Sequence, residues 1–95
     1  MSAVLHLEAE LNIYSAGALK QRLLDAFDVT PNLTLDVSSV CEADSAGVQL
    51  LIAASRHAAA AGGLLTLEGR SDALFDALGL LGLDAQLANL TRELP

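Results

Sequence analysis

The residues best suited to chemistry in this chain are Asp44 and Ser45, which follow a strand-like stretch and a short polar turn. Aspartate is a favoured helix N-cap because its carboxylate accepts bonds from backbone N–H groups that the first turn leaves unpaired. Ser45 would then lie in that first turn, where a phosphate would meet free N–H groups and the positive end of the helix dipole. This placement makes Ser45 a candidate phosphorylation switch, although a serine beside a cap can equally be an ordinary polar start to a helix.

A phosphate on Ser45 would also change the charge of this turn. It would add about −1.5 to −2 charge beside Asp44 and Glu42. The added charge would repel an acidic partner or disrupt a close-packed interface. Gly47 lacks a side chain, which would allow the backbone of a partner to approach the turn closely.

Few other residues offer catalytic chemistry. His6 and His57 lie far apart in the sequence and lack the spacing of a metal pair, and we expect His6 in a strand and His57 exposed on a helix. Cys41 has no base near it in sequence and is expected to be a small, partly buried side chain. Asp36 and Asp44 would need a pocket to work as an acid–base pair, and the sequence indicates none. We therefore expect no enzyme activity, no metal ion and no cofactor.

Composition limits the classes of partner. Ninety-five residues predict one small domain over residues 1–95. A net charge of −7, with five scattered basic residues, argues against a nucleic-acid surface. No apolar run reaches the roughly 18–20 residues that span a bilayer, and the start carries no signal-peptide pattern. The single cysteine excludes an internal disulfide and fits a reducing cytoplasm, so we expect a cytoplasmic protein without membrane insertion.

Strand and helix patterns alternate along the chain. Strands are expected at Val4–Ile13, with a break near 8–10, at Leu33–Val37 and at Leu64–Glu68. Helices are expected at Ala16–Phe27 after a Ser15 cap, from Ser45 to about Ala61 before Gly62-Gly63, and at Asp72–Leu80 after a Ser71 cap. A final short strand and helix are expected after Leu83.

Each helix pattern has an apolar stripe that should be buried. The expected stripes are Leu19, Leu23, Leu24, Ala26 and Phe27 in the first helix, Val48, Leu50, Leu51, Ile52, Ala54, Ser55 and Ala59 in the second, and Leu74, Ala77, Leu78 and Leu81 in the third. The alternation of strands and helices favours a mostly parallel sheet, to which the first segment could add an antiparallel edge.

Four segments together resemble a STAS domain, the module shared by bacterial anti-sigma-factor antagonists and the cytoplasmic tails of sulphate transporters. They are Glu10–Ala16, Leu33–Val40, the Asp-Ser-Ala-Gly of Asp44–Gly47, which resembles an Asp-Ser/Thr-x-Gly signature, and Gly62-Gly63 followed by Ser71–Leu83. The resemblance runs from about Leu5 to Leu87. It implies an α/β fold, a single domain whose mostly parallel or mixed sheet of four to five strands is flanked by three to four helices.

The resemblance also implies a function. In the antagonist branch, the Ser or Thr directly after the signature Asp is phosphorylated by a partner kinase of the GHKL ATPase class. Phosphorylation releases the partner, and a phosphatase restores binding. That position is Ser45 here, and the implied partner surface consists of Asp44, Ser45, Ala46, Gly47 and Gln49. Many antagonists carry Ser where this chain has Ala46, which leaves the phosphoacceptor in place but alters the fit to a particular kinase.

Three regulatory roles remain open within this family. The first is a partner-switching antagonist that binds an anti-sigma kinase and so regulates transcription. The second is the small STAS subunit of a bacterial lipid-transport ABC system, which binds the ATPase subunit. The third is a STAS protein of a chemotaxis signalling pathway. All three are protein-binding modules, whereas a domain that only forms a homodimer through its first strand would leave the Asp44-Ser45 signature unexplained.

Overall fold

Residues 3–80 are described by the computed structural model, and every strand pairing among them is parallel. The elements are β1 (Ala3–His6), β2 (Glu10–Leu11), α1 (Ala16–Phe27), β3 (Leu33–Asp36), β4 (Glu42–Ala43), α2 (Ser45–Ala60), β5 (Leu65–Glu68) and α3 (Asp72–Leu80). The α/β fold with parallel strands agrees with the sequence prediction. An antiparallel edge at the start is wrong, because β1 pairs with β3 in parallel.

The five strands form two sheets because the pairing of two chain segments is interrupted once. The first segment, residues 3–11, holds β1 and β2, and the second, residues 33–43, holds β3 and β4. β1, β3 and β5 form one sheet in the order β1–β3–β5, and β2 and β4 form a separate ladder. The offset between paired residues is 30 where Ala3 meets Leu33 and 32 where Glu10 meets Glu42. The second segment therefore holds two extra residues between its strands, which interrupts the pairing. The expected break near residues 8–10 is confirmed by the gap between β1 and β2.

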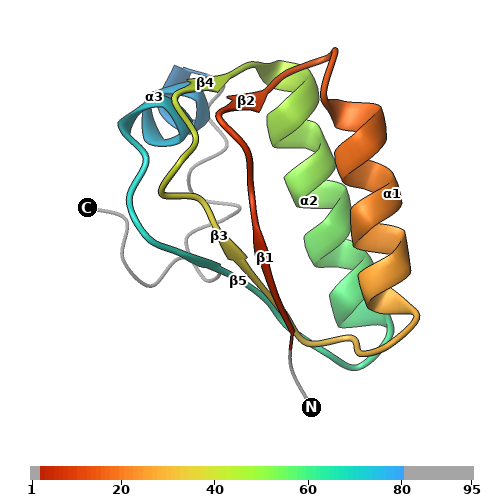
Figure 1. The fold of residues 1–95 in the computed structure, drawn as a ribbon. Helices are drawn as coiled ribbons and strands as arrows, with labels where there is room; N and C mark the ends of the chain where they lie inside the picture. Colours follow the sequence, from red (N-terminus) through yellow and green to blue (C-terminus); the bar gives the residue numbers. More distant parts are fainter. Residues whose placement is uncertain (1–2, 81–95) are drawn as a thin grey trace.

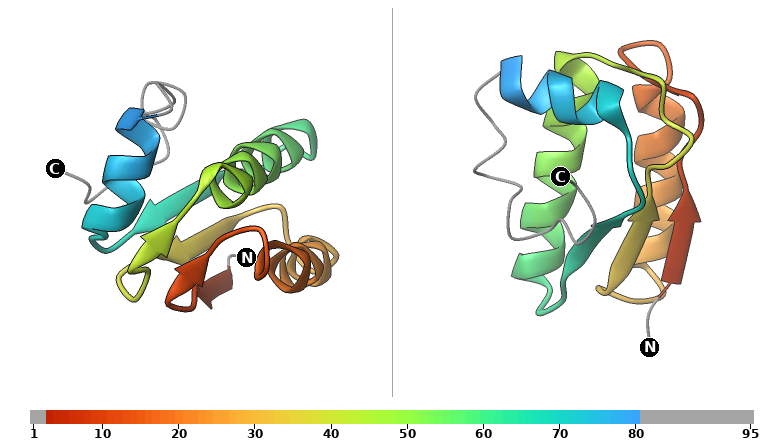
Figure 2. Two further views of the ribbon diagram at one scale, coloured as in Figure 1. Left: turned by 90° about the horizontal axis from the view of Figure 1, so that it is seen from above. Right: turned by 90° about the vertical axis from the view of Figure 1, so that its left-hand side faces the viewer.

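α1 and α2 lie side by side and cover one face of the three-stranded sheet (Figures 1 and 2). Alternation in β3 places Leu33 and Leu35 in the core, while Thr34 and Asp36 stay half-buried. α3 lies at the carboxyl end of the sheet, where it contacts β4 and α2 (Figure 1). The carboxyl ends of the strands, the start of α2 and the loop before α1 thus meet at one end of the molecule.

Most of the expected helix stripes are buried. Exceptions are Leu24, which is 42% exposed, and Ala59, which is exposed while Ala58 is fully buried. Leu24 follows the buried Leu23 by one residue, a rotation of about 100° around the helix axis that turns it away from the core. Ala58 takes the inner position because it lies seven residues after Leu51, which is two turns along the same face. Leu81 and the elements expected after Leu83 lie outside the described residues.

The helix ends show which expected caps form. Ser71 caps α3, because its hydroxyl accepts from the N–H of Leu74 at 3.1 Å and donates to the carbonyl of Val40 at 2.7 Å. Ser15 precedes α1 as expected, but its hydroxyl makes no capping bond and donates instead to the carbonyl of Glu10 at 2.7 Å. α2 ends at Ala60, and Gly62 then adopts a φ of 81°. Within residues 3–80, no helix is both long and apolar enough to cross a membrane.

Gly47 allows the first turn of α2 to rest directly on β2. It is buried, and a Cβ built on it would lie 2.6 Å from Cγ of Leu11 and closer still to the Leu11 carbonyl oxygen. The obstacle includes backbone, which cannot move without disturbing the β2–β4 ladder. The missing side chain therefore serves packing inside the chain.

We expect Gly47→Ala to destabilise the fold by about 1–3 kcal/mol, the range of overpacked cores. Gly17→Ala is the matched control, because Gly17 is also helical and a Cβ there would meet nothing within 4 Å. That control should be neutral or stabilising by up to about 1 kcal/mol. Chemical denaturation of both variants checks the difference, and equal stability would show that α2 does not need this contact.

Candidate functional site

Asp44 joins the start of α2 to the loop between β2 and α1. Its backbone is extended, with φ −124° and ψ −177°, as an N-cap requires. One carboxylate oxygen, Oδ1, accepts from the N–H of Gly47 at 3.1 Å. The other, Oδ2, accepts from the N–H of Ile13 at 3.1 Å, across 31 residues of chain. A single side chain therefore fixes two neighbouring turns.

Ser45 is the first residue of α2 and is exposed. Within residues 3–80 its hydroxyl makes no hydrogen bond. First-turn N–H groups have no helical acceptor, and Asp44 takes only that of Gly47. The hydroxyl thus lies open to solvent at the positive end of the helix dipole, where negative charge is favoured.

The other residues of the predicted partner surface differ in exposure. Ala46 is half-buried and Gly47 is buried, whereas Gln49 is exposed. Gln49 follows Ser45 by four residues, so both lie on one face of α2. Of the five predicted residues, Ser45 and Gln49 are thus exposed, Asp44 and Ala46 are half-buried, and Gly47 is buried.

Two exposed apolar residues beside Ser45 were not predicted from the sequence. Tyr14 is 93% exposed and Ile13 is 65% exposed, in the loop between β2 and α1. Ile13 was expected at the end of a strand, but the strand ends at Leu11. Buried Asn12 turns the chain, because its Oδ1 accepts from the N–H of Tyr14 at 2.9 Å and of Ser15 at 3.1 Å. An Asn whose side chain can bind the backbone N–H two residues later is the signal of an Asx turn. Asn12, shortly before a helix, is the residue that could have indicated this loop.

Carboxylates surround this loop. Glu10 and Glu42 are directly paired across the β2–β4 ladder, and both are exposed. The Nδ2 of Asn12 donates to Glu10 at 3.3 Å and to Glu42 at 3.2 Å. Like charges placed opposite each other on neighbouring strands repel, so this amide relieves only part of an unfavourable arrangement.

The remaining polar cluster joins His6, Asp36 and Ser38. At the ends of β1 and β3, Nδ1 of His6 lies 3.0 Å from Oδ2 of Asp36, and the Ser38 hydroxyl donates to Oδ1 of Asp36 at 2.5 Å. The serine contacts the carboxylate and not the histidine, so the histidine is not placed to take its proton. Asp36 ends β3 and Asp44 caps α2, and the two carboxylates form hydrogen bonds with different groups. The expectation of His6 in a strand is confirmed.

Cys41 and His57 are both exposed. The partly buried position expected for Cys41 is wrong, because the bend after β3 turns this residue outward, with its sulfur 3.5 Å from the Ala9 carbonyl. The exposed position of His57 is confirmed, and its ring lies 4.6 Å from that of Phe27. Within residues 3–80, no group of three His, Cys, Asp or Glu side chains could hold a metal ion.

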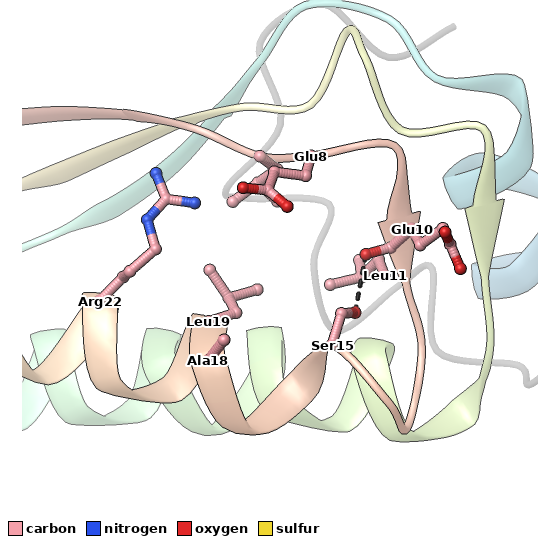
Figure 3. Close-up of a pocket in the computed structure, with 8 residues that line it drawn as sticks. Glu8, Glu10, Leu11, Ser15, Ala18, Leu19 and Arg22 are labelled. Carbon is pink, nitrogen blue, oxygen red and sulfur yellow. Dashed lines mark hydrogen bonds between the residues drawn. The ribbon is translucent and has the colours of Figure 1, made fainter.

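A small cavity of about 60 Å³ lies between α1 and the chain that links β1 to β2 (Figure 3). Arg22, Glu8 and Leu19 are among the residues that line it. Arg22 donates to the His6 carbonyl at 3.1 Å, which ties α1 to β1. Small-molecule pockets usually measure about 300–1,000 Å³, so this space is too small for a cofactor.

A family model described as "Mlab, STAS domain" matches residues 1–92. The chain belongs to the STAS domain family. STAS domains generally bind protein partners and are generally not enzymes. No curated protein sequence gives a significant match.

Solved structures agree on the fold. A sulfate transporter family protein from Wolinella succinogenes has a TM-score of 0.74 at 21% identity, covering 95% of this chain and 75% of its own. A putative anti-sigma factor antagonist from Thermotoga maritima has a TM-score of 0.71 at 23% identity, covering 86% of this chain and 74% of its own. The NMR structure of that Thermotoga protein has a TM-score of 0.69 at 21% identity, covering 97% and 71%. This STAS domain therefore shares its fold with proteins of two different descriptions.

Asp44→Ala should remove the cap and free the Ile13 N–H together. We expect a loss of about 1 kcal/mol of stability and faster hydrogen exchange at the Ile13 amide. Asp76→Ala is the control, because it removes one exposed carboxylate from α3. Amide exchange by NMR checks both variants, and an unchanged Ile13 amide would show that Asp44 does not hold the loop.

The hydroxyl and N–H of Ser38, with a smaller contribution from His6, hold the pKa of Asp36 below its ordinary value. The folded state thus favours the carboxylate, so this contribution to stability exists above the unfolded pKa and is lost as pH falls through the lowered folded pKa. Ser38→Ala should raise the pKa of Asp36 toward its ordinary value, and Ser39→Ala should not. NMR titration of the Asp36 carboxyl measures the shift, and equal pKa values in both variants would contradict the assignment.

Proposed function

We propose that this STAS domain is a non-enzymatic regulatory module that binds a protein partner around Ser45 and is switched by phosphorylation of Ser45. The observation that carries the proposal is the exposed Ser45 hydroxyl, which makes no hydrogen bond within residues 3–80. It lies at the first position of a helix whose cap is already occupied by Asp44. A kinase can therefore reach the hydroxyl without unfolding any part of the site.

The phosphoryl group would come from the partner's side of the complex. The Ser45 oxygen would bond to the γ-phosphorus of ATP held by a GHKL-type kinase, ADP would leave, and a base on the kinase would take the hydroxyl proton. This chain supplies only the acceptor, in keeping with a family that is generally not enzymatic. The product carries about −1.5 to −2 additional charge beside Asp44, in a chain whose net charge is already −7.

The partner would be released because a phosphate on Ser45 disfavours a close-packed interface. A partner that covers Ser45 and Gln49 would have to bury a phosphate dianion, and burying an unpaired charge is costly. The free chain pays no such cost, because Ser45 is exposed to water. Phosphorylation would thus destabilise the complex and leave the free domain folded.

The partner class remains part of the proposal. An anti-sigma factor with kinase activity in the bacterial cytoplasm fits a switched Ser45. The ATPase subunit of a lipid-transport ABC system, or a chemotaxis protein, would use the same surface without needing the phosphate. A homodimer through the open edge of β1 is a separate expectation, and the mass of the purified protein in solution tests it.

We expect Ser45→Asp to weaken partner binding on the order of tenfold or more, and Ser45→Ala to bind without responding to kinase. Ser39→Asp is the charge-matched control, because Ser39 is also exposed and the substitution adds the same charge in the turn between β3 and β4, outside α2. The wild type and these three variants are used for affinity capture from the native cell. Mass spectrometry of bait and partner then measures both binding and phosphate.

Two outcomes would redirect the proposal. If Ser45→Asp and Ser39→Asp bind equally and no phosphate is found on Ser45, the switch is refuted. A transporter ATPase retained by unphosphorylated bait would identify the lipid-transport branch and make Ser45 an ordinary interface residue.

A further inference from the structure

Backbone hydrogen bonds hold the loop of Ile13 and Tyr14, yet both side chains are exposed to solvent. Tyr14 is 93% exposed and Ile13 65% exposed. The backbone N–H groups of both residues are nevertheless bound, that of Ile13 to Asp44 and that of Tyr14 to Asn12. A fixed loop that buries neither of its large apolar side chains gains nothing from them in the free fold. A pre-ordered backbone lowers the entropy lost on binding, and tyrosine is enriched among the residues that carry most of the binding energy at protein interfaces.

This loop adjoins Ser45 through a single side chain. Asp44 binds the Ile13 N–H with one oxygen and the Gly47 N–H with the other, so the loop and the first turn of α2 are held at the same end of the fold (Figure 1). A partner that covers Ser45 must therefore lie close to Ile13. The backbone of Ile13 is thus bound to the residue that directly precedes the proposed switch.

Acidic residues line the hollow beside Tyr14. This hollow of about 320 Å³ is lined by Glu8, Glu10 and Asn12, among others, and no lysine or arginine of residues 3–80 lines it. Arg22 lies with Glu8 and Glu10 in the neighbouring cavity beside α1. Glu42 faces Glu10 across the ladder. A partner that approaches Tyr14 would relieve this repulsion by bringing positive charge, and an arginine or lysine in the hollow could also contact the face of the tyrosine ring.

We propose that Ile13 and Tyr14 are the apolar anchor of the partner-binding surface, and that the occupant is a protein surface with an apolar pocket rimmed by lysine or arginine. The inference rests on the proposed function, because it places this anchor beside Ser45. It also specifies how the phosphate acts. Long-range attraction to a basic rim would favour the phosphorylated form, so release must come from burying the dianion against Ile13 in a close-packed contact.

The first experiment replaces Tyr14 with the photoreactive aromatic benzoylphenylalanine and crosslinks in the native cell. Val29 receives the same replacement as a control, since it is exposed to 67% and lies beyond the other end of α1. We expect position 14, and not position 29, to crosslink to a partner peptide in which apolar residues neighbour lysine or arginine. Absence of a crosslink specific to position 14, an acidic peptide, or a second copy of this chain would each overturn the proposal.

The second experiment measures the affinity of the crosslinked partner for Tyr14→Ala, Ile13→Ala and Val29→Ala. We expect losses on the order of tenfold for the first two, none for Val29→Ala, and unchanged thermal unfolding in all three. Affinity should fall with salt, and less steeply in Glu42→Gln. Tyr14→Ala binding as tightly as wild type would refute the anchor.

The anchor and the switch can fail separately. If Ser45→Asp abolishes binding while Tyr14→Ala does not, the anchor is wrong and the switch stands. If Tyr14→Ala weakens binding while Ser45→Asp and phosphorylation do not, the anchor stands and the switch is wrong.

Discussion

The carboxylate of Asp44 holds together two turns that lie 31 residues apart in the chain. One oxygen satisfies an N–H in the first turn of α2, and the other satisfies the N–H of Ile13. Each carboxylate oxygen thus accepts a backbone N–H, one from each turn. The role of Asp44 is to set where Ser45, Ile13 and Tyr14 stand, and the chemistry of the site depends on that placement.

The support beneath Asp44 comes from the short ladder of β2 and β4. The N–H of Asp44 donates to the carbonyl of Leu11 at 3.1 Å, and Gly47 rests on the same residue. This contact is made at the carboxyl end of the strands, beyond the interruption in the pairing of the two segments. Two extra residues in the second segment thus produce a separate platform on which α2 begins, apart from the main sheet that fills the core.

Sequence patterns predicted α1, α2 and α3 well because each helix buries a stripe that repeats every 3.6 residues. The Asp44 cap of α2 was also predicted, since capping is a local interaction. The exposed loop was not, because Ile13 continues an apolar strand pattern and leaves it only through Asn12 and a bond to the distant Asp44. The prediction for Cys41 was wrong for a similar reason, since the chain between β3 and β4 turns this residue outward. Local periodicity cannot reveal contacts made across some 30 residues.

The occupied cap also decides where a phosphate on Ser45 can act. Because Oδ1 of Asp44 already binds the Gly47 N–H, a phosphate could take that donor only by displacing this oxygen and disturbing the side chain that also holds Ile13. Repulsion between the two anions on adjacent residues opposes this exchange. Because Ser45 is exposed, the phosphate can remain in water instead. In the proposed switch, the dianion would stay solvated in the free domain and leave the loop in place. Its free-energy cost would arise only when a partner closes over it, so the complex would respond to phosphorylation while the fold would not.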